Sequence, residues 1–137
     1  MTIYALSSGP GLAGISVIRV SGPDTKKVIL NLTDHEPPKP RVATNRKFNK
    51  INDNELIDEG ILIWFPGPNS YTGEDMAEFH VHGSKAVVEA IQSSISKIEG
   101  CRLAEPGEFT KIAFQNGKIN LLKAESISDL ISSETEI

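Results

Sequence analysis

The sequence predicts an α+β domain in which a mixed, mostly antiparallel sheet carries helices packed on one face. Three observations lead to this prediction. Apart from one short helical segment, β-branched runs typical of strands dominate as far as Val81, and amphipathic helical patterns follow. Short turns between strands favour hairpins over a regular alternation of strand and helix. The 137 residues, 39% of them hydrophobic, suit a folded domain with a buried core.

Two strands are expected at residues 3–6 and 15–20, where β-branched side chains gather. They are joined by residues 9–14, whose spacing is Gly-x-Gly-x-x-Gly. In a dinucleotide-binding fold this motif lies between a strand and a helix whose N-terminus holds the pyrophosphate. Because a strand follows here, we interpret the segment as a flexible loop or as a loop that closes over a ligand.

A short helix should follow the second strand, because Pro23 suits its first turn and the apolar residues 28–30 supply part of a buried face. Residues 42–48 and 56–65 then predict a hairpin about a turn-prone Asn-Asp-Asn sequence. A loop rich in proline and glycine leads into one more alternating run at residues 76–81.

The last part of the chain has the periodicity of helices. Apolar residues recur every three to four positions from Lys85, and Gly100 should end that helix. Residues 108–116 predict a second helix, and residues 121–132 a third with Asn120 as its N-cap. The third pattern has no helix stop, so we expect the chain to be a piece of a longer protein.

Composition narrows the classes of function. The formal net charge is −4 and the 14 Lys and Arg are spread along the chain, which disfavours unaided nucleic-acid binding. Cys101 is the only cysteine, so the sequence has no disulfide framework, and we interpret this residue as a packed thiol. The start resembles no signal peptide and no apolar run could span a bilayer, so we expect a cytoplasmic protein without a membrane partner.

Residues 76–82 alternate in polarity, which places Glu78, His80 and His82 on one face of a strand. Two imidazoles and a carboxylate could bind zinc or iron, although the sequence identifies no further ligand for a catalytic site. The alternative is a polar strand face that lines a cleft or bonds to the next loop.

Three further charged residues invite a functional interpretation. Arg19 is the one charge in an apolar strand, so its guanidinium must reach water, a partner carboxylate or a ligand. Glu108 suits the positive N-terminus of a helix. Lys118 follows a helix stop and could meet an anion. The sequence contains no Gly-x-x-x-x-Gly-Lys-[Ser/Thr] motif, so it has no P-loop for a nucleoside triphosphate.

Several motifs follow one another along the chain in a distinctive order. They are Ile18-Arg-Val-Ser-Gly22, Ser70-Tyr-Thr-Gly-Glu-Asp75, Glu78 with His82-Gly83, Pro106-Gly-Glu-Phe-Thr110, Ala113-Phe-Gln-Asn-Gly-Lys118 and Ala124-Glu-Ser-Ile-Ser-Asp-Leu-Ile131. In this order they resemble the N-terminal domain of tRNA-modifying GTPases of the MnmE (TrmE) family. The chain departs from the usual family pattern at Ser84, Glu105 and Ile112, where a glycine and two arginines are common.

The resemblance implies a fold similar to tetrahydrofolate-binding domains of aminomethyltransferases. It also implies a homodimer that holds a one-carbon tetrahydrofolate, formyl- or methylene-tetrahydrofolate, at each subunit contact. The folate-contacting residues of the family fall on Arg19, Glu78 and Lys118. A carboxylate can accept paired hydrogen bonds from the pterin, while cations suit the carboxylates of the folate tail. Residues 1–119 would form this folate-binding and dimerisation domain, and 120–137 the start of a central helical domain, truncated before the G domain.

The resemblance further implies that the intact parent binds GTP, magnesium and potassium in a later G domain. With an FAD-dependent partner similar to MnmG, it would install an aminomethyl-type group at C5 of the wobble uridine of tRNA. Without a P-loop, this chain should have no GTPase activity. Three alternatives stay open: a stand-alone folate-dependent aminomethyltransferase or iron–sulfur-assembly relative, a metal-dependent enzyme using Glu78, His80 and His82, and a purely structural dimerisation module.

Overall fold

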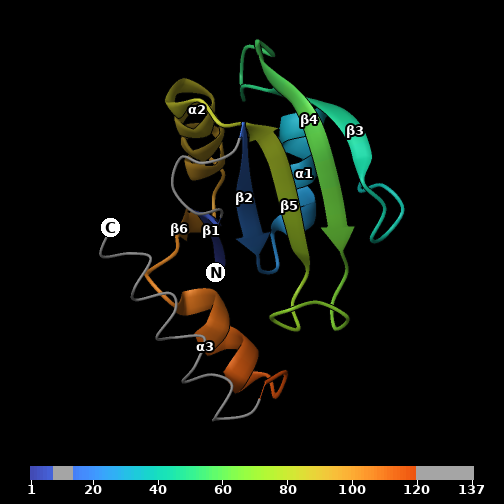
Figure 1. The fold of residues 1–137 in the computed structure, drawn as a ribbon, viewed down its shortest axis with the longest axis vertical. Helices are drawn as coiled ribbons and strands as arrows, with labels where there is room; N and C mark the ends of the chain where they lie inside the picture. Colours follow the sequence, from blue (N-terminus) through green and yellow to red (C-terminus); the bar gives the residue numbers. More distant parts are fainter. Residues whose placement is uncertain (8–13, 120–137) are drawn as a thin grey trace.

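The structure is a computed structural model that describes residues 1–7 and 14–119 (Figure 1). Most of the glycine loop at 9–14, the predicted helix at 121–132 and the proposed boundary after residue 119 lie outside the described residues. In chain order the described elements are β1 (Thr2–Leu6), β2 (Ile15–Ser21), α1 (Thr25–Thr33), β3 (Thr44–Asn49), β4 (Leu56–Phe65), β5 (Met76–His82), α2 (Lys85–Ser96), β6 (Cys101–Leu103) and α3 (Glu108–Gln115).

The strands form one sheet in the order β3-β4-β5-β2-β1-β6. β1 and β6 are parallel, and the other neighbouring strands pair antiparallel. The prediction of an α+β fold with a mixed, mostly antiparallel sheet is therefore confirmed. The predicted hairpin of β3 and β4 is also present. Pairing of β2 with β5 joins segments far apart in the sequence, and this pairing builds the centre of the sheet.

β6 is a strand that the sequence analysis did not predict. It has only three residues with Arg102 in the middle, too few to show an alternating pattern. Backbone hydrogen bonds attach it to β1: Thr2 N donates to Gly100 O at 2.9 Å, and Ala104 N donates to Tyr4 O at 2.8 Å. The helix before it ends at Ser96, earlier than the predicted end at Gly100. Tertiary pairing, and not local propensity, therefore defines this edge of the sheet.

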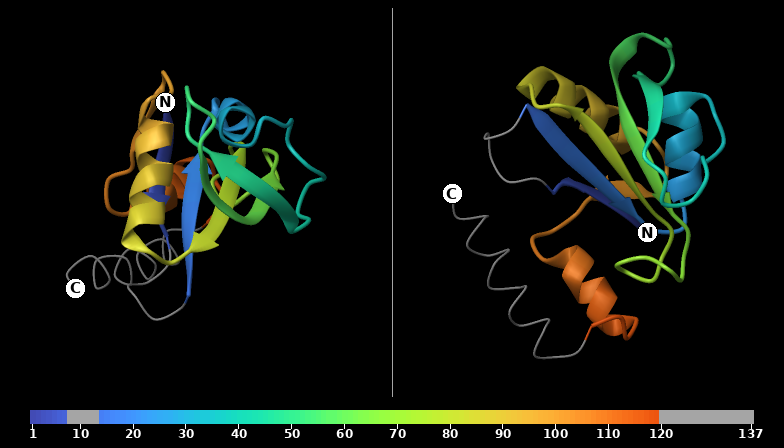
Figure 2. Two further views of the ribbon diagram at one scale, coloured as in Figure 1. Left: turned by 90° about the horizontal axis from the view of Figure 1, so that it is seen from above. Right: turned by 45° about the vertical axis from the view of Figure 1, so that its right-hand side comes forward.

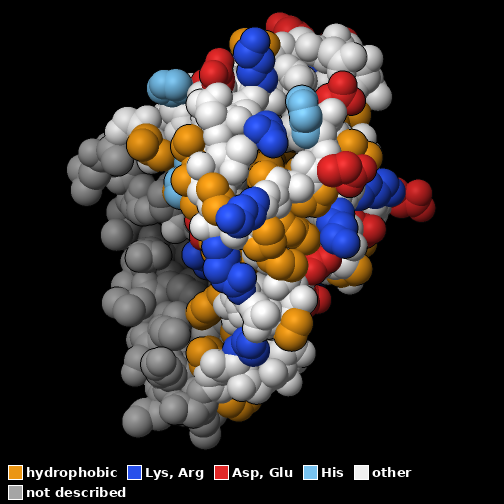
Figure 3. Space-filling view, turned by 90° about the vertical axis from the view of Figure 1, so that its right-hand side faces the viewer, with side chains coloured by type: hydrophobic (Ala, Val, Ile, Leu, Met, Phe, Trp, Pro, Cys, Tyr) orange, Lys and Arg blue, Asp and Glu red, His pale blue; other side chains and the backbone are white. Residues whose placement is uncertain are grey.

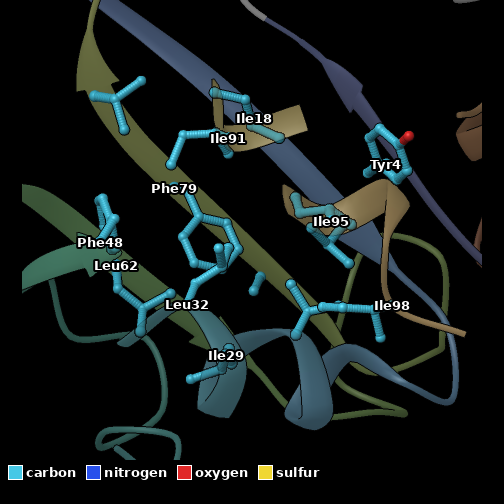
Figure 4. Close-up of a cluster of buried hydrophobic side chains, with 14 of the residues drawn as sticks. Tyr4, Ile18, Ile29, Leu32, Phe48, Leu62, Phe79, Ile91, Ile95 and Ile98 are labelled. Carbon is cyan, nitrogen blue, oxygen red and sulfur yellow. The ribbon is translucent and has the colours of Figure 1, made fainter. Parts of the chain in front are cut away.

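α1 and α2 cover one face of the sheet (Figure 2). The main hydrophobic core lies between this face and the two helices (Figure 4). At its centre the rings of Phe48 and Phe79 meet edge to face, with centroids 5.3 Å apart. Ile18 on β2 and Ile91 on α2 are fully buried in the same cluster. The alternation predicted for β5 is confirmed, because Ala77, Phe79 and Val81 are buried in this core.

α3 lies on the other side of the sheet from α1 and α2 (Figure 2). Its residue Phe109 contacts Arg19, whose neighbours Ile18 and Val20 point into the main core. α3 thus closes one end of the sheet face that the other two helices leave open. This arrangement separates a face devoted to the core from a face that carries the charged residues predicted to be functional.

Charged side chains of both signs surround a hydrophobic patch on the side of the molecule formed by the β3 edge (Figure 3). Within residues 1–7 and 14–119, no helix has the length and apolar character needed to cross a membrane.

Phe79→Ala should lower the free energy of unfolding by about 3–5 kcal/mol, because it removes a fully buried ring and leaves a cavity against Phe48. Urea denaturation followed by circular dichroism would measure this loss. The exposed Val42→Ala is a control that should change stability by less than about 0.5 kcal/mol. A Phe79→Ala cost similar to that of the control would contradict the assignment of this ring to the core.

Candidate functional site

The pairing of β2 with β5 brings two of the predicted site residues together. Arg19 and Glu78 are direct partners in the strand register, and Arg19 Nη2 lies 3.6 Å from Glu78 Oε2. Their side chains are 30% and 21% exposed, so each keeps a face toward solvent. The charge of Arg19 in the apolar strand β2 is therefore paired with the carboxylate of Glu78, which belongs to the same predicted site.

Two aromatic rings hold the guanidinium of Arg19. Its Cζ lies 5.6 Å from the ring centroid of Tyr71 and 5.8 Å from that of Phe109. Both distances are within the range of a cation–π interaction. The Nε of Arg19 is buried and has no hydrogen-bond partner among the described residues. The arginine is thus oriented by ring contacts from a loop and from a helix, and it is only loosely held by its carboxylate.

The loop of residues 66–75 is fastened to the end of β2. Ser21 Oγ and Thr72 Oγ1 share a buried hydrogen bond of 2.7 Å, and Ser21 Oγ also donates to Glu74 Oε1 at 3.0 Å. The Tyr71 hydroxyl is hydrogen-bonded to Thr110 Oγ1 on α3 at 3.0 Å. These bonds fix the position of the Tyr71 ring above Arg19 and tie the loop to α3.

Lys118 lies against the same loop. Its Nζ donates a hydrogen bond to Pro68 O at 2.8 Å, and Asn116 Nδ2 donates to Thr72 O at 2.7 Å. Gly73 has a φ of +85°, and a Cβ there would lie 3.3 Å from the Cβ of Asn116, so the close approach favours glycine. The structure thus brings Arg19 and Glu78 into contact, and it places Lys118 beside the loop that carries Tyr71.

The two histidines predicted to share a face with Glu78 make different contacts. His80 Nε2 is 3.0 Å from Glu78 Oε1, whereas His82 Nδ1 is 2.8 Å from Asp58 Oδ1. Burial raises the pKa of Asp58, but hydrogen bonds from the His82 amide and imidazole and from the Glu59 amide outweigh it and lower this pKa. In the described part of the chain, no three His, Cys, Asp or Glu residues are grouped to hold a metal ion.

Glu108, at the start of α3, makes more than a contact with the helix dipole. Its carboxylate accepts hydrogen bonds from both terminal nitrogens of Arg102, with Nη1 at 2.8 Å from Oε1. The backbone N of Glu105 donates to the same oxygen at 2.9 Å. Hydrogen bonds from Arg102 hold the pKa of Glu108 below its ordinary value of 4.5, despite the opposing effect of burial. This ion pair connects α3 to β6.

Sequence reasoning gave no role to Tyr71, Phe109 or Arg102. The first two lie in motifs that carry the family resemblance, but nothing local showed that their rings would meet Arg19. Arg102 belongs to the unpredicted strand β6. The sequence signal for the Arg102–Glu108 ion pair is an arginine six residues before a glutamate at the start of a helix, and this pattern is too common to be specific.

The fold and these contacts define an α+β domain with a charged and aromatic cluster on the open face of its sheet. A family model described as GTP-binding protein TrmE N-terminus matches residues 2–118. The chain belongs to this family.

Curated relatives cover the whole chain. It is 75% identical over 137 residues to a tRNA modification GTPase MnmE of Pelagibacter ubique, and 50% identical over 135 residues to one of Brucella anthropi. It is also 48% identical over 135 residues to a mitochondrial 5-taurinomethyluridine-[tRNA] synthase subunit GTPB3 of Danio rerio. The matches include 98–100% of this chain but only 27–31% of each relative, so the chain spans less than a third of their length.

The Glu108 ion pair predicts a pH dependence of stability. Because the folded-state pKa of Glu108 is lowered, its contribution is complete above about pH 4.5 and is lost as the pH falls through the lower folded-state value. The native chain should therefore lose more of its free energy of unfolding between about pH 5 and about pH 3 than Glu108→Gln does. Urea unfolding across this range would measure it, with the exposed Glu36→Gln as control. Parallel pH profiles for the native chain and Glu108→Gln would contradict the assignment.

Proposed function

We propose that this chain is the N-terminal, homodimerising domain of a tRNA modification GTPase and that it binds a one-carbon tetrahydrofolate through Arg19, Glu78 and Lys118. The observation that carries this proposal is the Arg19–Glu78 pair on the open face of the sheet, at 3.6 Å. Two residues separated by 59 positions in the family motifs meet there as register partners. When bound, the folate supplies a one-carbon unit at the reduction level of a formyl or methylene group.

The donors and acceptors of the cluster suit the chemistry of a pterin. The carboxylate of Glu78 is acceptor-only when ionised, which fits the amino-pyrimidine edge of a pterin with its paired N–H donors. Charge-assisted hydrogen bonds of this kind are about twice as strong as neutral ones. His80 contacts one oxygen of Glu78 at 3.0 Å, and Arg19 approaches the other, so the plane of the carboxylate is fixed before a ligand arrives.

The cations and rings suit the rest of the ligand. Lys118 carries an exposed ammonium group that could meet a carboxylate of the folate tail after leaving Pro68 O. Tyr71 and Phe109 add flat apolar surface beside Arg19, of the kind that lines small-molecule sites. The described residues therefore fit a flat, anionic ligand with a hydrogen-bonding edge.

The parent protein is proposed to be cytoplasmic and to modify tRNA. A later G domain would bind GTP with magnesium and potassium, and an FAD-dependent partner similar to MnmG would act with it on C5 of the wobble uridine. The names of the relatives from Pelagibacter ubique and Danio rerio support the tRNA part of this proposal. Positive and negative side chains are mixed on the face in Figure 3, which agrees with tRNA being held by the full complex.

Purified chain should bind 5-formyl-tetrahydrofolate in a saturable manner, and Glu78→Gln should weaken this binding by about 1–3 kcal/mol because a charge-assisted pair is lost. Isothermal titration calorimetry would measure both affinities. Light scattering on the same samples should give the mass of a dimer.

Glu59→Gln is the matched control, since Glu59 is an exposed carboxylate on the neighbouring strand β4 and should leave the affinity unchanged. Absence of saturable binding by the native chain would overturn the folate proposal. Equal affinities for the native chain and Glu78→Gln would remove Glu78 from the site, and a monomeric mass at high concentration would remove the dimer.

A further inference from the structure

The beginning of α3 is fixed by one charged contact. Both terminal nitrogens of Arg102 reach the carboxylate of Glu108, and the amide of Glu105 donates to the same carboxylate at 2.9 Å. The side chain of Glu108 is only 16% exposed, whereas that of Arg102 is 42% exposed, so the carboxylate is shielded from solvent while the guanidinium reaches it. Arg102 belongs to β6, so the contact joins the edge of the sheet to the helix.

The two residues after Glu108 make the contacts that organise the candidate site. Phe109 places its ring 5.8 Å from the guanidinium carbon of Arg19. Thr110 shares a hydrogen bond of 3.0 Å with the hydroxyl of Tyr71, the other ring against Arg19. Residues in one helical turn move together, because their backbone torsions are fixed by the helix. A shift of Glu108 would therefore move the Phe109 ring directly and would act on the Tyr71 ring through its hydrogen bond to Thr110.

From this arrangement we propose that Arg102 and Glu108 are positioning residues for the Arg19–Glu78 site. Their ion pair sets the start of α3 and thereby the orientation of the guanidinium between Phe109 and Tyr71. The consequence for ligand binding rests on the proposed function, whereas the consequence for Arg19 itself does not. The ring contacts described for Arg19 are with Tyr71 and Phe109, so the effect of Arg102 and Glu108 passes through these two rings.

A simpler role for Glu108 is a favourable contact with the positive end of the α3 dipole. That role needs a negative charge at position 108 and is indifferent to Arg102. The two explanations differ for the charge-reversed double variant Arg102→Glu/Glu108→Arg. The dipole alone disfavours this variant more than Glu108→Gln. The positioning role predicts instead that the reversed pair recovers the part of the site that depends on the ion pair.

The test compares the native chain with Glu108→Gln, Arg102→Gln, Arg102→Lys and the reversed double variant. One readout is the Nε–H signal of Arg19 in a ¹H–¹⁵N spectrum, which senses the two neighbouring rings. The other is the affinity for 5-formyl-tetrahydrofolate. We expect each single Gln variant to move the Arg19 signal and to weaken binding about tenfold. The double variant should restore part of both, because it regains the ion pair but cannot accept the hydrogen bond of the Glu105 amide. Glu55→Gln, which removes the exposed pair with Lys50, is the matched control.

Unchanged Arg19 signals and unchanged affinities in both Gln variants would overturn the proposal. If a Gln variant fails to fold, Arg102→Lys replaces it in the test, because lysine keeps the charge and loses the paired geometry. An unchanged Arg19 signal and affinity in Arg102→Lys would then overturn the proposal. If the native chain does not bind the folate, the proposed function fails, while the Arg19 signal still tests the positioning role.

Discussion

A guanidinium group in the central part of an apolar strand is the constraint on which the open face of this sheet depends. Arg19 lies between Ile18 and Val20, both fully buried in the core on the opposite face. A charge at such a place is costly unless it is paired and partly solvated. The chain meets this requirement with a carboxylate from β5, with two aromatic rings and with a side chain that still reaches water.

Each of these partners imposes a condition on the fold. Glu78 can face Arg19 only if β5 lies beside β2 in the observed register. A slip of one residue would turn the side chain of Glu78 to the other face of the sheet. The same register aligns Ser21 with Met76, and Ile3 of β1 with Ser21, in a buried row beside the site. The hydrogen bond between Ser21 and Thr72 then holds the loop in place over this row. Burial and site geometry therefore depend on one set of strand pairings.

The sequence predicted the parts of this arrangement that depend on local patterns. Alternation along β5 was enough to place Glu78 and His80 away from the core, because side-chain direction in a strand follows from position alone. The contact of Glu78 with Arg19 was not predictable in this way, since it depends on which strands pair. β6 was missed for a related reason. Its three residues are too few to show an alternating pattern, and the strand forms because it pairs with the edge of β1.

The three departures from the expected family pattern lie outside the contacts described for Arg19. Ser84, where a glycine is usual, is the N-cap of α2, and its Oγ accepts a hydrogen bond from Val87 N at 3.1 Å. Glu105 contributes its backbone amide to the contact with Glu108, and any residue except proline could donate there. Ile112 lies in α3, beyond the residues that contact Arg19 and Tyr71. The departures thus concern a cap and the charge near α3, while the contacts described for Arg19 come from Glu78, Tyr71 and Phe109.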